Sequence, residues 1–418
     1  MNTESTQSSS TIPEGIEETQ EEEEILEPFN PEEIDIISQP AVLGQLIDRI
    51  ERRYHAHPAA YICLDPDFQR SENIWEATQK SRLIESVLLG IPLPMFYVSA
   101  STAGVWDVVD GIQRLGAFRD FMLGEKYLQS LENKTPDHRL KGVGFKLQNL
   151  EFLTQFDGKS FMDLPGKQQE DLKGCPLQVT IIRPGTPEAV KFNIFKRINT
   201  GGQPLTHQEI RHALHQGAAT VFLKKLVEHQ EFLAATSGSI KDNRMEGREL
   251  ILRFLSTKIL NWENSTVSKI NVDQMLNQTM RILNELGDTP EKTKEPMPQF
   301  DKTLTLDNLT DFFVQAMQRN KELFGNYAFR KSLPGAERRT QVNKALFEMW
   351  GNLLGNLNTE QWEKIISNKA NFLTGCQKIY TYSDDTYNFD KSVGQWASLT
   401  SMIKRRYSFC RDLLDSYL

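Results

Sequence analysis

Cysteine is scarce in this sequence, and the few residues present are widely separated. Four cysteines occur among 418 residues, and no two of them stand in a C-x-x-C pair. This spacing indicates neither a disulfide framework nor a zinc site. We therefore assign no residue as a metal ligand and expect a reducing compartment.

Long apolar runs and two familiar motifs are also missing. No uninterrupted hydrophobic stretch reaches the length of a membrane span, so no membrane association is expected. The opening residues, MNTESTQSSS, lack the basic and apolar regions of a secretory signal, which favours a cytoplasmic location. No G-x-x-x-x-G-K-[ST] sequence occurs, so phosphate binding by a Walker A loop is excluded.

Positive charge is absent from the first part of the chain. The first basic residue is Arg49, whereas residues 1–35 hold twelve of the 56 acidic residues. The overall charge of −8 therefore hides a body with 48 basic and 44 acidic residues, or about +4. Low hydrophobicity and dense like charge predict that residues 1–38 form an acidic disordered tail. The alternative is an acidic arm that covers a basic groove. Basic candidates for that groove, each of which also fits a solvated helix face, are Arg52-Arg53, Lys224-Lys225, Arg338-Arg339 and Lys404-Arg405-Arg406.

The remainder of the chain divides into a mixed part and a helical part. Apolar spacing predicts helices in 41–54, 75–90 and 115–123, and β-branched runs predict strands in 61–64, 91–100, 104–109 and 176–184. Beyond residue 217, four long segments carry helical apolar faces, and residues 287–303 have the composition of a linker or exposed loop. We therefore expect an α+β fold with domains at 39–216 and 217–418.

The segment VVDGIQRLGAF places polar residues where a predicted strand passes through a glycine into a predicted helix. The start of that helix gathers unpaired N–H groups and the positive end of the helix dipole, which favours an anion. Arg114 offers a bidentate fork for phosphate, Gln113 a neutral donor, and Asp110 an orienting group or a ligand for a divalent cation. The alternative is an ordinary turn with an N-capping aspartate and a surface ion pair.

Two further segments carry polar residues beside predicted turns. Arg197 and Asn199 precede the glycine pair that ends at Gly202, and a new helix with Glu209 and Arg211 follows. Paired glycines suit a tight turn or close approach of the backbone to a ligand. A T-x-x-E capping box with Thr206 explains Glu209 equally well. The third segment, DPDFQR, places Gln69 and Arg70 just after a predicted strand.

These motifs occur in an order that resembles a known family. LDPDFQR, GIPLP, VVDGIQRLGAF and FKRINTGGQPLTHQEIRHAL follow one another in the first half of the chain. The set is similar to the N-terminal domain of the GmrSD restriction system, a type IV restriction system. The resemblance covers about residues 40–215 and implies a ParB/sulfiredoxin-like fold there, followed by a mostly α-helical domain.

The resemblance implies a nucleotide-binding, NTP-hydrolysing protein that acts on DNA in restriction and phage defence. An NTP would be its ligand or substrate, and Mg²⁺ is the candidate cofactor. Catalytic roles would fall to Asp110, Gln113 and Arg114. Nucleotide-binding roles would fall to Gln69, Arg70, Gly111, Arg197, Asn199, Gly202, Glu209 and Arg211.

Two departures from the family pattern keep a second interpretation open. Ile112 stands where the common motif has glutamine, and isoleucine can neither accept a proton nor orient a water molecule. No convincing HNH nuclease arrangement occurs in the second half. The alternative is therefore a non-catalytic module that binds nucleotide or DNA and recruits a partner nuclease, or acts as a homo-oligomer.

Overall fold

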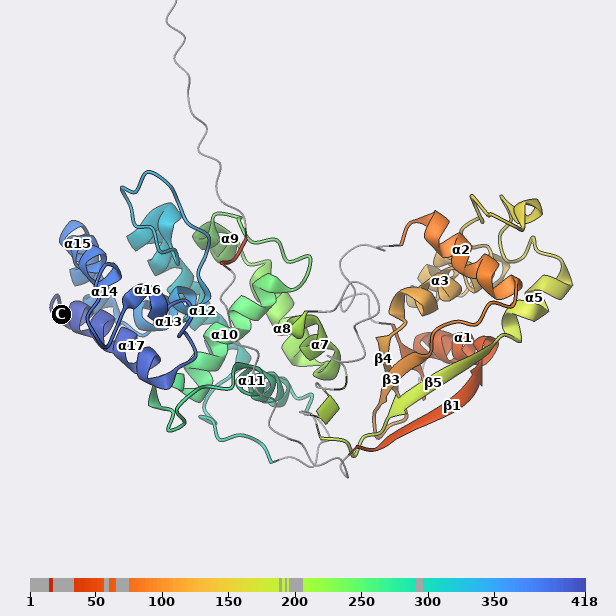
Figure 1. Ribbon diagram of the computed structural model, residues 1–418, viewed down its shortest axis with the longest axis horizontal. Coiled ribbons are helices and arrows are strands. Elements are labelled where there is room, and N and C mark those ends of the chain that lie inside the picture. Colours follow the sequence, from red (N-terminus) through yellow and green to blue (C-terminus); the bar gives the residue numbers. More distant parts are fainter. Residues whose placement is uncertain are drawn as a thin grey trace, which may run out of the picture. The chain divides into compact units, whose positions relative to one another are not determined.

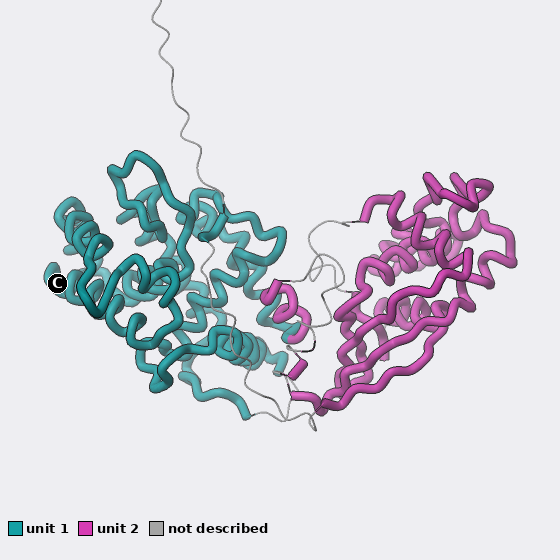
Figure 2. Tube along the Cα trace, viewed as in Figure 1, with its two compact units in different colours: residues 1–27, 215–291, 296–418 teal, residues 28–214, 292–295 magenta. Residues whose placement is uncertain are grey.

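The computed structural model describes residues 15–17, 34–55, 60–64, 75–187, 190–191, 194, 206–290 and 296–418. It divides into two compact units (Figure 2). One is built mainly from Pro28–Leu214, and the other from Met1–Glu27, His215–Glu291 and Pro296–Leu418. We call them the α+β unit and the helical unit. Their element content confirms the predicted α+β class.

The α+β unit is organised around one five-stranded mixed sheet (Figure 1). Its strands are β1 (Ile36–Val42), β2 (Ile62–Cys63), β3 (Phe96–Ala100), β4 (Trp106–Asp110) and β5 (Pro176–Ile182). Their spatial order is β1-β5-β3-β4-β2. The β1–β5 and β3–β4 pairs are antiparallel, whereas the β5–β3 and β4–β2 pairs are parallel.

Helices cover both faces of this sheet because its strands alternate apolar side chains between them. Leu177, Val179 and Ile181 of β5 belong to the main core, whereas Ile182 packs with Val109 and Ile210 in a small second cluster. The helices of the unit are α1 (Leu43–Glu51), α2 (Ala77–Leu88), α3 (Ile112–Met122), α4 (Glu125–Glu132), α5 (Gly166–Lys173) and α7 (His207–Leu214). Short 3-10 turns add η2 (Arg52–Tyr54), η3 (His138–Leu140) and η4 (Thr154–Phe156).

Strand β1 was not predicted from the sequence. Pro40 interrupts the segment IISQPAV and has no N–H to donate, which argues against a central strand. The structure resolves the conflict by placing β1 at the edge, where Pro40 pairs with Gln178 of β5. Residues 36–38, which we assigned to the acidic tail, are therefore part of the sheet. The only other tail residues that the structure describes are Gly15–Glu17, Ile34 and Asp35.

The helical unit has its own apolar core, to which each of its main helices contributes. These helices are α8 (Ala218–Val227), α9 (Gln230–Thr236), α10 (Glu246–Leu260), α11 (Val272–Leu286), α12 (Leu306–Phe324), α13 (Lys344–Gly355), α14 (Thr359–Ser367), α15 (Lys369–Tyr380), α16 (Phe389–Ser392) and α17 (Thr400–Asp415). Short turns η5 (Trp262–Asn264) and η6 (Gly325–Tyr327) complete the unit. Helix α13 is buried from Ala345 to Gly355, and its mostly apolar sequence includes two buried polar residues, Glu348 and Asn352.

Candidate phosphate site at the start of helix α3

The polar motif lies where β4 ends and α3 begins. Asp110 is the last residue of β4 and pairs with Tyr97 of β3, whereas Val98 pairs with Val108. The strand β4 therefore carries one extra residue, Val109, between these pairs. Such bulges bend a strand and redirect the side chains beside them. This bulge lies directly before the turn that leads into α3.

Gly111 makes this turn possible for two separate reasons. Its φ is 94°, a left-handed conformation that side chains with a Cβ disfavour. A Cβ at this position would also lie 2.3 Å from Cδ1 of Phe96. With glycine as the N-cap, no side chain caps α3. The first N–H groups of the helix therefore have no partner within it and remain suited to an anion.

Arg114 is engaged with the protein. Its Nη1 donates to the carbonyl of Pro94, and its Nη2 donates to the carbonyl of Met95 at 3.3 Å and to Asp110 Oδ2 at 2.8 Å. The guanidinium also lies over the Phe96 ring, 4.4 Å from its centroid. Burial lowers the pKa of Arg114 despite the neighbouring carboxylate. This residue holds the loop before β3 against the start of α3.

Asp110 and Gln113 are the other polar residues of this junction. The Asp110 side chain is 36% exposed, and one of its oxygens binds Arg114. Gln113 is partly buried, and its side chain has no hydrogen bond to any described residue. Ile112 packs against the core of the unit instead of entering the site. The junction thus offers helix N–H groups, one amide and one carboxylate.

The last helix of the unit, α7, carries two of the predicted nucleotide-binding residues. Thr206 and Glu209 form the expected capping box: Thr206 N donates to Glu209 Oε2 at 2.6 Å, and Glu209 N donates to Thr206 Oγ1 at 3.1 Å. Arg211 is only 1% exposed, and its Nη1 donates to Gln208 Oε1 at 2.5 Å. Ile210 packs the helix against β4. Both polar residues therefore contribute to the helix itself.

The other predicted ligand-binding residues lie outside the described part of the chain. They are Gln69, Arg70, Arg197, Asn199 and Gly202. Their convergence on the junction stays a prediction. Among the described residues, no group of three or more histidine, cysteine or acidic side chains is placed to hold a metal ion.

A comparison with protein-family models decides the relationship of this part of the chain. Residues 43–216 match the model of the GmrSD restriction endonuclease, N-terminal domain. This region is similar to that family's N-terminal domain. The GmrSD-type region includes the whole β4–α3 junction and α7. Searches of curated proteins and of solved structures gave no significant match. The narrower likeness to ParB and sulfiredoxin stays a prediction. No helix among the described residues combines the length and apolarity needed to cross a membrane.

Sequence reasoning missed a buried charge cluster in the GmrSD-type region. Lys80 Nζ lies 2.9 Å from Asp120 Oδ2, and Arg119 Nη2 lies 2.6 Å from Asp120 Oδ1. The side chains of Lys80 and Asp120 are 9% and 2% exposed. A signal was present, because Lys80 falls on the same helical stripe as Ile84 and Val87. A charge within an apolar stripe indicates a buried partner.

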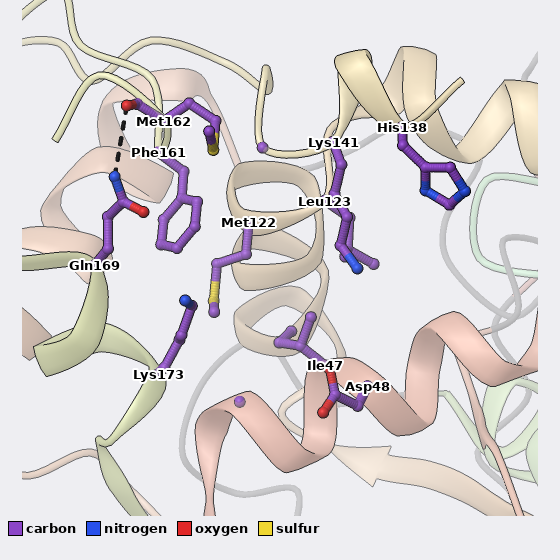
Figure 3. Close-up of a pocket in the computed structure, with 12 residues that line it drawn as sticks. Ile47, Asp48, Met122, Leu123, His138, Lys141, Phe161, Met162, Gln169 and Lys173 are labelled. Carbon is purple, nitrogen blue, oxygen red and sulfur yellow. Dashed lines mark hydrogen bonds between the residues drawn. The ribbon is translucent and has the colours of Figure 1, made fainter. Parts of the chain in front are cut away.

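A cavity of about 540 Å³ also lies in this region, at the opposite end of α3 (Figure 3). Ile47, Met122 and Phe161 give it an apolar lining, while Lys141 and Lys173 stand at its side (Figure 3). Both lysines are already paired, with Glu51 and Glu170 respectively. The eleven residues of α3 separate the cavity from the Gly111 turn, or roughly 15 Å at the helical rise. The cavity is therefore not part of the candidate phosphate site.

Proposed function

We propose that the α+β unit binds the phosphate groups of a nucleotide at the start of α3, as part of a restriction system that acts on DNA. The family relationship supports the restriction context. The observation that carries the binding site is the glycine-capped start of α3, beside which the Gln113 side chain has no hydrogen bond to a described residue. Backbone N–H groups at a helix start and a neutral amide are suitable donors for phosphate oxygens.

A magnesium ion fits this arrangement only as a bridge. Asp110 offers a carboxylate at the junction, and one of its oxygens is already bound to Arg114. Mg²⁺ is commonly held by one or two carboxylates together with substrate phosphates and water. Asp110 would supply the protein ligand, and the nucleotide would supply the others. The predicted residues Gln69, Arg70, Arg197 and Asn199 would close the site.

NTP hydrolysis is the first candidate activity, with Gln113 positioning the attacking water. Glutamine can orient a water molecule for phosphoryl transfer without accepting its proton. A specific observation favours the second candidate, which is binding without turnover. Ile112 occupies the motif position next to Gln113 and packs into the core, so it leaves one polar group fewer for the reaction. In that case the protein would be a non-catalytic module that binds nucleotide and recruits a partner nuclease.

The test uses the full-length protein with Mg²⁺, each of the four NTPs and plasmid DNA. Phosphate release or nicked circles that disappear in Gln113→Ala would support an enzyme. Gln45→Ala is the matched control, because Gln45 is an exposed glutamine on α1. Saturable NTP binding without phosphate release or nicking would support the second candidate. Absence of binding to all four NTPs would refute both.

A further inference from the structure

Three residues of the acidic N-terminal segment pair with the helical unit. Gly15 N donates to the carbonyl of Ser239 at 2.8 Å, and Glu17 N donates to the carbonyl of Val342 at 2.8 Å. Ile16 thereby forms a parallel β-bridge with Val342. Val342 also forms an antiparallel bridge with Arg330. Residues 15–17 thus lie as an extended segment beside Val342, which already pairs with Arg330 within the helical unit.

The side chains of the segment support the same placement. Ile16 is half-buried and packs against the core of the helical unit. The Glu17 carboxylate lies 2.8 Å from Lys331 Nζ and accepts from Asn343 Nδ2 at 2.9 Å. Asn343 is fully buried and also caps α13, so its position is fixed independently of the segment. Backbone, apolar and charged contacts therefore occur together over three residues.

The receiving surface is held by contacts inside the helical unit. Arg330 is 1% exposed and donates to the carbonyls of Thr340 and Thr236 and to Ser239 Oγ. Burial and the nearby Arg339 lower its pKa to about 10. Burial alone would lower the pKa of Lys331, but Asp390 and Glu17 outweigh it and raise that pKa. A carboxylate at this position therefore meets a cation that stays charged at neutral pH.

We propose that Ser239, Arg330, Lys331 and Val342 form a docking site for an extended acidic segment, and that its occupant is Gly15–Glu17 of the same chain. Addition of an extended segment to an exposed edge is a common mode of peptide recognition, in which backbone hydrogen bonds supply affinity and side-chain pockets supply specificity. Here Ile16 packs against the apolar core of the helical unit, and Lys331 pairs with the carboxylate of Glu17. The inference is independent of the proposed nucleotide site.

The docking has a consequence for the acidic run that follows. Glu17 is bonded to the helical unit, whereas residues 36–42 form strand β1 in the sheet of the α+β unit. Residues 18–33, with eight glutamates among sixteen residues, therefore lie in the sequence between residue 17 of the helical unit and strand β1 of the α+β unit. The acidic run is thus flanked on both sides by residues that pair with a folded unit.

Hydrogen–deuterium exchange on the full-length protein tests the docking directly. The amides of Gly15 and Glu17 should exchange at least about tenfold more slowly than in a free peptide of residues 11–20, because two net hydrogen bonds contribute on the order of 1–3 kcal/mol. Ile16→Ser should restore exchange to the rate of the peptide, whereas Ile12→Ser in the same segment should not. Glu17→Gln should accelerate exchange, and the matched Glu14→Gln should leave it unchanged.

Two results would overturn the proposal. One is exchange of Gly15 and Glu17 in the wild-type protein at the rate of the free peptide. The other is equal protection in Ile16→Ser and Ile12→Ser. None of these variants touches the β4–α3 junction, so nucleotide binding should be unaltered throughout.

Discussion

Arg114 shows how a residue in a ligand-binding motif becomes part of the scaffold. The sequence suggested that its charge would meet a phosphate. In the structure its donors serve two backbone carbonyls and Asp110, and its side chain is 12% exposed. Removing it would break the hydrogen bonds to the carbonyls of Pro94 and Met95 and the partly buried ion pair with Asp110.

We therefore expect Arg114→Ala to destabilise the unliganded protein. Loss of hydrogen bonds from a charged donor costs about 1.5–3 kcal/mol in the free energy of unfolding. Chemical denaturation followed by circular dichroism measures this change. Arg139→Ala is the control, because Arg139 is 89% exposed and its loss should have little effect. Equal stability of Arg114→Ala and the wild type would mean that Arg114 does not stabilise the fold and acts in ligand binding alone.

Glu85 connects two elements in the same way. This buried carboxylate on α2 accepts the amides of Glu151, Phe152 and Leu153, at 3.0, 2.7 and 2.7 Å. Burial alone would raise the pKa of Glu85, but the three amide donors and Arg82 outweigh it, and the pKa is lowered. Helix α2 thus fixes the loop that leads into η4.

Glu85→Gln should destabilise the fold in a pH-dependent manner. A lowered pKa in the folded state contributes stability that is complete above the unfolded pKa, about 4.3, and is lost as the pH falls through the folded value. The deficit of the variant should be about 1.5–3 kcal/mol near pH 7 and should shrink below about pH 4. Urea titrations at pH 7, 5 and 3.5 measure it, with the exposed Glu151→Gln as control. A deficit that does not change with pH would show that the charge of Glu85 is unimportant.

The elements could be predicted from the sequence where local pattern and tertiary context agree. Strands β3, β4 and β5, helices α2 and α3, and the Thr206–Glu209 capping box appear where spacing and composition indicated them. Strand β1 was missed because Pro40 is acceptable only at an edge, and edge position is a property of the whole sheet. The partners of Lys80 and Arg114 were not predictable, because they come from segments distant in sequence.

At the scale of the whole molecule, charge is divided between the acidic N-terminal segment and the rest of the chain. The structure removes Arg406 from the candidates for a basic groove, because it is fully buried beside Glu348. Arg405 is bound to Asp384 and Thr386. Arg338 is exposed and stays a candidate. Any groove must therefore use fewer cations than the sequence suggested.

Deleting residues 1–33 should strengthen DNA binding, mainly at low salt. The deletion removes eleven carboxylates and must stop before Asp35, whose carbonyl accepts from Arg183 N at 2.9 Å. Screening weakens competition by the acidic residues as salt rises. Titrations at two salt concentrations compare the truncated and full-length proteins, with Ile16→Ser separating loss of docking from loss of charge. Equal affinities at both concentrations would mean that the acidic residues do not compete with DNA.

Calorimetric titration of NTPs tests most directly whether phosphate binds at the start of α3. A hydrogen bond to a charged group contributes about 1.5–3 kcal/mol, so Gln113→Ala should weaken binding about ten- to a hundredfold. Gln45→Ala should bind as the wild type does, and neither variant should lose thermal stability. Equal affinity of Gln113→Ala and the wild type for every nucleotide that binds would contradict the assignment of the phosphate site to this junction.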